Sequence, residues 1–132
     1  ALLSYCNFGN PPGAVTDTMS DAMVLLDGAA KAGAVDFEYD GEMGVDVALD
    51  PDRSLIYPFC RLAGPANVLV MPGLHAANIS TRLVQRFGAA TSIGPILIGL
   101  EKPVQIVSMD ASVSDLVQMA LMAAHSCAPK LL

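Results

Sequence analysis

The stretch Gly64-Pro-Ala-Asn-Val-Leu-Val-Met-Pro-Gly73 decides the fold class of this chain. Its centre, Val68-Leu69-Val70, is a continuous apolar run, and a Gly-Pro pair and a Pro-Gly pair bound the stretch. A short apolar run between such breakers is typical of a strand that is buried on both faces. Strands of that kind occur in parallel sheets covered by helices, so the stretch predicts an α/β fold.

The rest of the chain alternates between helix-like and strand-like patterns around this stretch. Apolar residues recur every three or four positions in three segments, which predict helices over residues 16–31, 76–87 and 112–125 with their apolar faces toward the core. Apolar extended patterns predict strands over residues 1–8, 35–39, 66–71, 93–98 and 104–107, whereas 45–49 is ambiguous. We therefore predict an α/β fold with a mainly parallel sheet that is sandwiched by helices.

The composition predicts a folded chain whose surface is partly covered by other protein. Of 132 residues, 53% are hydrophobic and only 15% are charged, against about 25% charged in an ordinary globular chain. This balance excludes intrinsic disorder, which needs low hydrophobicity and high net charge. So few charges would leave much of the surface of a free domain apolar. We therefore expect a tight homo-oligomer, a piece of a longer polypeptide, or both.

The charge pattern excludes several classes of partner. Seven Lys and Arg stand against thirteen Asp and Glu, and no basic cluster is present, so we expect no binding to nucleic acid. The longest uncharged stretch, 62–81, contains prolines and asparagines and is unsuited to spanning a bilayer, and no signal peptide pattern leads the chain. Three widely spaced cysteines are typical of reduced thiols, which predicts a cytoplasmic protein.

Ligand-binding residues are expected in the loops that follow the predicted strands, because ligands gather at the carboxyl ends of parallel strands. Three loops qualify: 40–42, 99–103 and 108–112. Neither a GxGxxG sequence nor a Walker A sequence is present, so we expect no standard dinucleotide or nucleoside triphosphate loop.

Two sets of charged residues have more than one interpretation. Arg82 and Arg86 lie four positions apart on a predicted helix, where they would hold phosphates or form a solvated flank. The acidic residues of 36–46 would bind a metal ion or simply alternate along a strand edge.

The first turn of the last predicted helix contains a carboxylate that could have a structural role or a binding role. Ser108 ends a predicted strand, and Asp115 lies in the first turn of the helix that follows. The spacing of Ser112 and Asp115 fits a capping box, which would give Asp115 a structural role. Its place beside a ligand loop fits a binding role instead.

Four motifs carry a resemblance to a known family. They are Asp-Phe-Glu-Tyr-Asp-Gly-Glu-Met-Gly-Val-Asp-Val-Ala-Leu at 36–49, Tyr-Pro-Phe-Cys-Arg-Leu at 57–62, Gly-Pro-Ala-Asn-Val-Leu-Val-Met-Pro at 64–72 and Gly-Pro-Ile-Leu-Ile-Gly-Leu-Glu-Lys-Pro-Val at 94–104. From about residue 2 to residue 124 the chain resembles the phosphotransacetylase family. It is most similar to the phosphotransacetylase-like domain at the C-terminus of large bacterial NADP-dependent malic enzymes.

The resemblance implies an architecture for the chain. The family fold is an α/β sandwich like that of isocitrate and isopropylmalate dehydrogenases, with two subdomains around a cleft. Residues 1–99 would be the C-terminal part of the second subdomain, and residues 100–132 would return to complete the first, so the chain would be a partial domain. The family also implies a homo-oligomer, a dimer or a higher assembly.

The resemblance also implies site residues. In active phosphotransacetylases a Ser-Arg pair and an Asp seven residues after the Ser belong to the catalytic site; the Ser matches Ser108 and the Asp matches Asp115. The position of the Arg holds Met109, which removes a cation that would stabilise acyl transfer. A family arginine associated with coenzyme A binding matches Arg86, and Arg82, Lys102 and Ser108 are further candidates to contact the ligand.

These matches imply an acetyl-CoA-binding regulatory segment of a malic enzyme. The NADP and the divalent metal of malate oxidation would then belong to an upstream part, and no metal ligand is expected in this chain. The alternative is an active phosphate acetyltransferase, which transfers acetyl between acetyl phosphate and coenzyme A.

Overall fold

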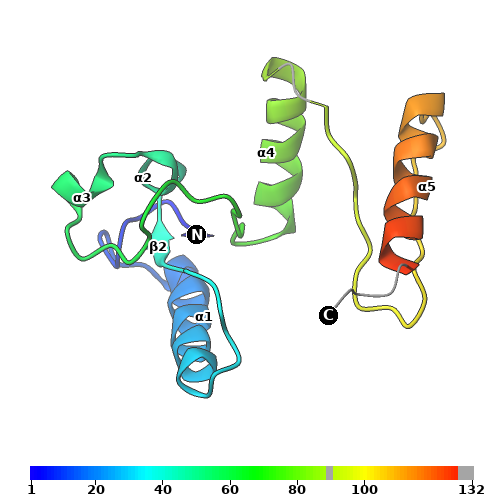
Figure 1. The fold of residues 1–132 in the computed structure, drawn as a ribbon. Coiled ribbons are helices and arrows are strands. Elements are labelled where there is room, and N and C mark those ends of the chain that lie inside the picture. Colours follow the sequence, from blue (N-terminus) through cyan, green and yellow to red (C-terminus); the bar gives the residue numbers. More distant parts are fainter. Residues whose placement is uncertain (89–90, 128–132) are drawn as a thin grey trace. The chain divides into compact units, whose positions relative to one another are not determined.

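The computed structural model describes residues 1–88 and 91–127 (Figure 1). The chain divides into two compact units, Ala1–Arg82 and Leu83–Leu132, and each is described by itself. Among the described residues, no helix is both long enough and apolar enough to cross a membrane.

A small parallel sheet forms the centre of the first unit. Strand β1 (Leu2–Leu3) pairs in parallel with strand β2 (Gly41–Met43). On its other side β1 meets Val70 in a parallel bridge, in which the Leu3 N–H donates to the Val70 carbonyl at 2.8 Å. Gly41 permits the close approach, because it has a φ of +155° and an added Cβ would lie 2.7 Å from the Leu2 carbonyl oxygen.

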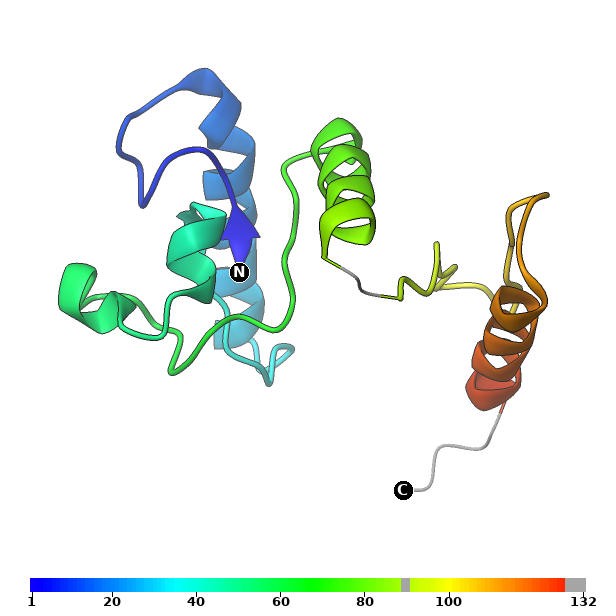
Figure 2. The ribbon, with the colours of Figure 1, turned by 90° about the horizontal axis from the view of Figure 1, so that it is seen from above.

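Helix α1 (Ala14–Lys31) packs against this sheet (Figures 1 and 2). Its methionines Met19 and Met23 lie on one face, as the three- and four-residue spacing predicts, and they are buried against Leu2. The helix ends where the sequence predicts, because Gly33 takes a φ of +75° and its N–H caps the Ala30 carbonyl at 2.9 Å.

The opposite side of the sheet carries the short helix α2 (Val45–Leu49), and a second short helix, α3 (Arg53–Ile56), follows it in the chain. Leu3, Met43, Val47 and Ala48 form a buried cluster there. Parts of 57–71 pack over this cluster, so the stretch that decides the fold class contributes directly to the core.

A buried arginine fastens α2 to the loop that follows it. Arg53 is only 3% exposed, and its guanidinium donates to the Asp50 carbonyl at 2.7 Å and to the carbonyls of Ala48 and Leu62 at 3.5 Å. It forms no ion pair with a carboxylate among the described residues, and its Nε–H has no hydrogen-bond partner there. The side chain therefore acts as a clamp on backbone carbonyls.

A second arginine of the same unit, which is half-exposed, forms ion pairs with two carboxylates. Arg61 contacts the Asp27 carboxylate at 2.7 Å and the Asp40 carboxylate at 3.3 Å, and it lies over the ring of Tyr39. The hydrogen bonds from Arg61 and from the Tyr39 hydroxyl lower the pKa of Asp27. The charge of Arg61 is thus engaged by two carboxylates within the first unit.

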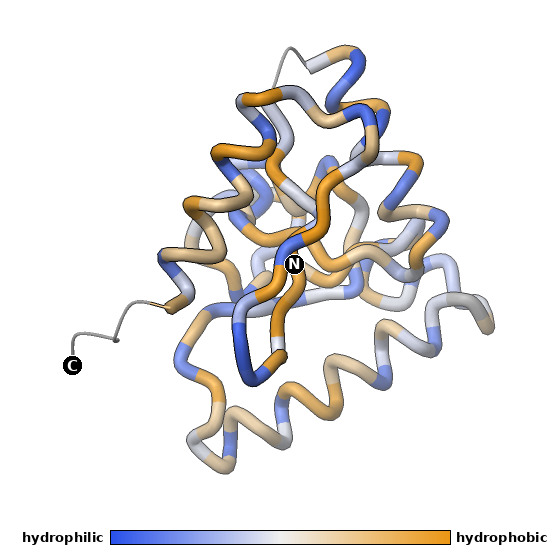
Figure 3. Tube along the Cα trace, turned by 90° about the vertical axis from the view of Figure 1, so that its right-hand side faces the viewer, coloured by the Kyte–Doolittle hydropathy of each residue, from blue (hydrophilic) through white to orange (hydrophobic). Residues whose placement is uncertain are grey.

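Two longer helices complete the chain. Helix α4 (Leu74–Phe87) begins in the first unit and ends in the second, and α5 (Val113–Cys127) lies in the second. Both were predicted from periodicity, and both are confirmed. Most of their apolar side chains, however, are exposed: Phe87 is 81% and Leu121 is 64% exposed, whereas Met119 of α5 is buried. Hydrophobic residues recur along the helix that leads to the C-terminus (Figure 3).

The sheet is smaller than the sequence predicts. Within 1–8 only Leu2–Leu3 is a strand, 66–71 contributes one bridge, and 93–98 and 104–107 are extended but unpaired among the described residues. The prediction for 35–39 is wrong: the strand lies at Gly41–Met43, which overlaps the predicted ligand loop 40–42. Apolar runs favour extended backbone, but a strand exists only where another strand accepts its hydrogen bonds. Near residue 97 the Gln105 side chain takes that place, because its amide binds both the N–H and the carbonyl of Leu97.

Candidate functional site

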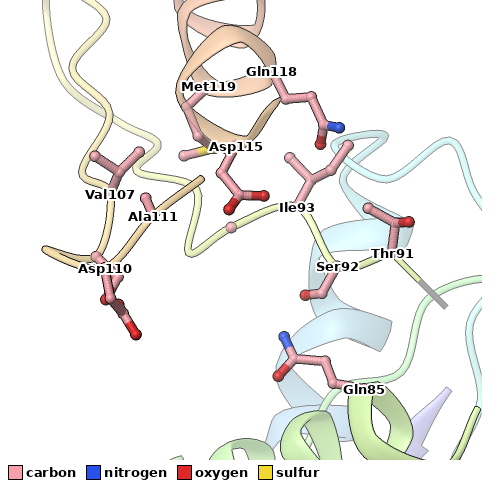
Figure 4. Close-up of a pocket in the computed structure, with 12 residues that line it drawn as sticks. Gln85, Thr91, Ser92, Ile93, Val107, Asp110, Ala111, Asp115, Gln118 and Met119 are labelled. Carbon is pink, nitrogen blue, oxygen red and sulfur yellow. The ribbon is translucent and has the colours of Figure 1, made fainter. Parts of the chain in front are cut away.

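The second unit contains a polar pocket of about 350 Å³ (Figure 4). Three parts of the unit line it. They are the end of α4 with the segment after it (Gln85, Thr91, Ser92, Ile93, Gly94), the loop before α5 (Val107, Ser108, Asp110, Ala111) and the first turns of α5 (Asp115, Gln118, Met119). In Figure 4 Asp115 extends from α5 toward Ile93, and Gln85 rises from α4 toward Ser92.

The loop before α5 presents a serine that is paired with a carboxylate. The Ser108 hydroxyl donates to the Asp110 carboxylate, so its proton is not free for a ligand. This bond and a backbone N–H bond lower the pKa of the Asp110 carboxyl. Asp110 is therefore ionised at neutral pH.

Asp115 forms the capping box that its spacing predicts. Its carboxylate accepts from the Ser112 N–H at 2.9 Å and from the Ser112 hydroxyl at 2.8 Å, while its own N–H donates to the Ser112 oxygen at 3.2 Å. The Ser112 hydroxyl, followed by the Ser112 N–H, lowers the pKa of Asp115. A general base works best with a pKa near the working pH, so this carboxylate is a weak base and a stable negative charge.

The pocket is acidic. Two ionised carboxylates line it, and no Lys or Arg is among its described lining residues. Such a surface attracts N–H and O–H donors and repels anions. The described part of the pocket thus lacks the cationic partner that would stabilise the developing charge of acyl transfer to phosphate.

The structure brings together only some of the predicted site residues. Ser108 and Asp115 line the pocket, but Arg86 and Lys102 are exposed and do not line it, and Arg82 belongs to the first unit. Met109, at the position to which the resemblance assigns an arginine, is fully exposed and also lies outside the lining. Of the three predicted ligand loops, 108–112 is therefore the one that contributes to this pocket.

Sequence reasoning included Asp110 only as a member of the ligand loop 108–112, and it missed Gln118 and Gln85. Gln118 lies three residues after Asp115 on the same helix face, so it follows from spacing once the pocket is known. Gln85, directly before Arg86, gives no signal of its own in the sequence.

Two of the acidic residues of 36–46, Asp40 and Glu42, have structural partners. Glu42 is buried and accepts from the Ser20 hydroxyl at 2.5 Å and from the Gly9 N–H at 3.0 Å. Asp40 is buried beside Arg61. Within 1–88 and 91–127, no group of three or more His, Cys, Asp or Glu side chains is placed to hold a metal ion.

Comparison with known proteins gives consistent matches. The family model described as phosphate acetyl/butaryl transferase matches residues 1–124. The chain is 52% identical over 126 residues to the NADP-dependent malic enzyme of Rhizobium meliloti, covering 96% of the chain and 16% of that protein. It is 38% identical over 120 residues to the phosphate acetyltransferase of Clostridium acetobutylicum, covering 90% of the chain and 35% of that protein.

A solved structure matches as well. The EutD phosphotransacetylase from Staphylococcus aureus superposes with a TM-score of 0.86 at 30% identity, over 95% of this chain and 38% of that one. The chain therefore spans 16% of the malic enzyme, and 35% and 38% of the two acetyl-transferring relatives.

Proposed function

Because the chain belongs to the phosphate acetyl/butaryl transferase family, we propose that it is an acetyl-CoA-binding regulatory segment of a cytoplasmic NADP-dependent malic enzyme. Oxidative decarboxylation of malate to pyruvate, with its NADP and divalent metal, belongs in this proposal to another part of the protein. The segment itself transfers no acetyl group. The high identity to the malic enzyme of Rhizobium meliloti supports this parentage.

One observation carries the proposal that the segment is catalytically silent. Asp110 and Asp115 line the pocket with Ser108, whereas Met109 occupies the family's arginine position and no described lining residue is cationic. Preorganised cations and N–H donors at the developing charge are commonly the largest contribution to such catalysis, and the loss of one donor costs roughly 3 kcal/mol. A pocket without that cation retains binding and loses turnover.

The proposed ligand contacts divide by charge. Arg86, with Arg82 and Lys102, binds the phosphates of coenzyme A, because guanidinium and ammonium groups are the usual partners of phosphate. Arg86 and Lys102 are exposed and form no ion pair with another described residue, which leaves them available. Ser108 and Asp115 contact the uncharged arm near the thioester.

The proposal includes the architecture that the family resemblance implies. Residues 1–99 and 100–132 belong to two subdomains of a dehydrogenase-like sandwich, and the protein is a homo-oligomer. Large exposed apolar side chains support the proposed assembly, among them Leu25, Phe87 and Ile98.

The test is inhibition of malate oxidation. The full-length protein is assayed for malate-dependent NADP reduction while acetyl-CoA is raised, with free coenzyme A as the control ligand. Because a ligand shifts an equilibrium only by binding one state better, the rate is expected to fall as acetyl-CoA saturates its site. A rate that does not respond to acetyl-CoA, or an absence of malate oxidation, would contradict the proposal.

A further inference from the structure

Asp110 is a carboxylate of the pocket to which the proposed function gives no role. It lies in the loop directly before α5 (Figure 4), and Ser108 and Asp115 line the same pocket; these three residues are called its acidic wall. It takes no part in the Ser112–Asp115 capping box, and within the described part of the chain its side chain is hydrogen-bonded to the Ser108 hydroxyl. A residue placed in a pocket without a folding role is a candidate determinant of which ligand enters.

The hydrogen bonds on this wall fix its polarity. The Ser108 hydroxyl donates a hydrogen bond to Asp110, and the Ser112 hydroxyl donates one to Asp115. The wall therefore presents carboxylate oxygens and serine lone pairs, all of which accept hydrogen bonds. Across the pocket, Gln85, Thr91 and Ser92 are neutral groups that add no positive charge.

We propose that Asp110 is a specificity-determining residue whose carboxylate makes the pocket reject anionic ligands, such as inorganic phosphate and acyl phosphates, and accept uncharged groups with N–H donors. The inference rests on the proposed function in that it takes this pocket as the site of the ligand's uncharged arm. It assigns the phosphates to exposed cations outside the pocket and the amide-bearing arm to the acidic wall.

The physical reason is that the carboxylates repel an anionic ligand and no cation in the described pocket lining offsets the repulsion. Phosphate brings one to two negative charges, which would lose water beside two carboxylates and meet no described cation in the pocket lining. An amide N–H instead donates to a carboxylate, which is a charge-assisted hydrogen bond. Because the pocket is open to water, the repulsion is screened by salt and is largest at low ionic strength.

The experiment compares two variants of the full-length protein that remove one negative charge each. Asp110→Asn keeps the shape and the acceptor for Ser108, and Asp36→Asn neutralises an exposed aspartate of the first unit as the matched control. Calorimetry at low ionic strength measures binding of inorganic phosphate and, separately, of acetyl-CoA. Asp110→Ser provides a second neutral variant, and circular dichroism checks that each variant keeps its helices.

Asp110→Asn and Asp110→Ser are expected to raise the affinity for inorganic phosphate about tenfold over wild type and over Asp36→Asn. The gain should shrink as salt is added. Equal phosphate affinities in the Asp110 and Asp36 variants, or no detectable phosphate binding to any of them, would overturn the inference. Failure of the wild type to bind acetyl-CoA would instead contradict the proposed function, and the phosphate comparison would still decide the role of Asp110.

Discussion

Arg86→Ala is expected to raise the acetyl-CoA concentration that half-inhibits malate oxidation by about 10- to 100-fold. A hydrogen bond to a charged group contributes about 1.5–3 kcal/mol, and every 1.4 kcal/mol is a factor of ten in affinity. Arg86 is exposed in the last turn of α4 and is not engaged by a described carboxylate, so a phosphate does not have to displace an existing partner. The measurement is the inhibition curve of the full-length protein.

Arg61→Ala is the matched control for this effect. It removes the same guanidinium from a site where Asp27 and Asp40 already neutralise it, so it should leave the inhibition curve unchanged. Arg86→Lys should fall between wild type and Arg86→Ala, because an ammonium keeps the charge but loses the bidentate geometry. Equal curves for wild type and Arg86→Ala would remove Arg86 from the binding site.

Arg53→Ala is expected to lower the free energy of unfolding of the first unit by about 2–4 kcal/mol. The substitution opens a cavity beside the buried cluster and leaves the carbonyls of Ala48, Asp50 and Leu62 without the guanidinium that binds them. A buried polar group left unpaired costs about 1–3 kcal/mol, and truncation of a buried side chain adds to that. Urea denaturation of the full-length protein, followed by hydrogen exchange over residues 45–62, measures the loss.

Two companion variants make this result interpretable. Arg53→Met restores most of the lost volume but none of the hydrogen bonds, so it should recover only part of the stability. Arg61→Ala, at a half-exposed and paired guanidinium, should cost much less. If Arg53→Ala were no more harmful than Arg61→Ala, the clamp would contribute nothing to stability.

The helices could be predicted from the sequence because their signals are local. The spacing of Met19 and Met23 and the glycine at 33 lie within the segment that they organise, and the helix over 16–31 is confirmed as Ala14–Lys31. The Ser112–Asp115 capping box is local in the same way, and its predicted geometry is confirmed.

The strands and the pocket depend on partners that a local pattern does not contain. The apolar segments 93–98 and 104–107 were predicted as strands, yet their backbone groups meet no described strand. Asp110 was predicted only as part of the ligand loop 108–112, because its own role arises when Ser108 donates to it in the folded loop. The burial of Arg53 was not predicted, because arginine is rarely buried without a carboxylate partner. From the sequence alone its side chain is expected on the surface.

The most direct test of whether this domain senses its ligand or converts it is thiol consumption in a mixture of acetyl phosphate, coenzyme A and the full-length protein. We predict no consumption above the protein-free rate, under conditions in which calorimetry shows that acetyl-CoA is bound. Sustained formation of acetyl-CoA by the wild-type protein, lost when Ser108 is replaced by alanine, would contradict the account.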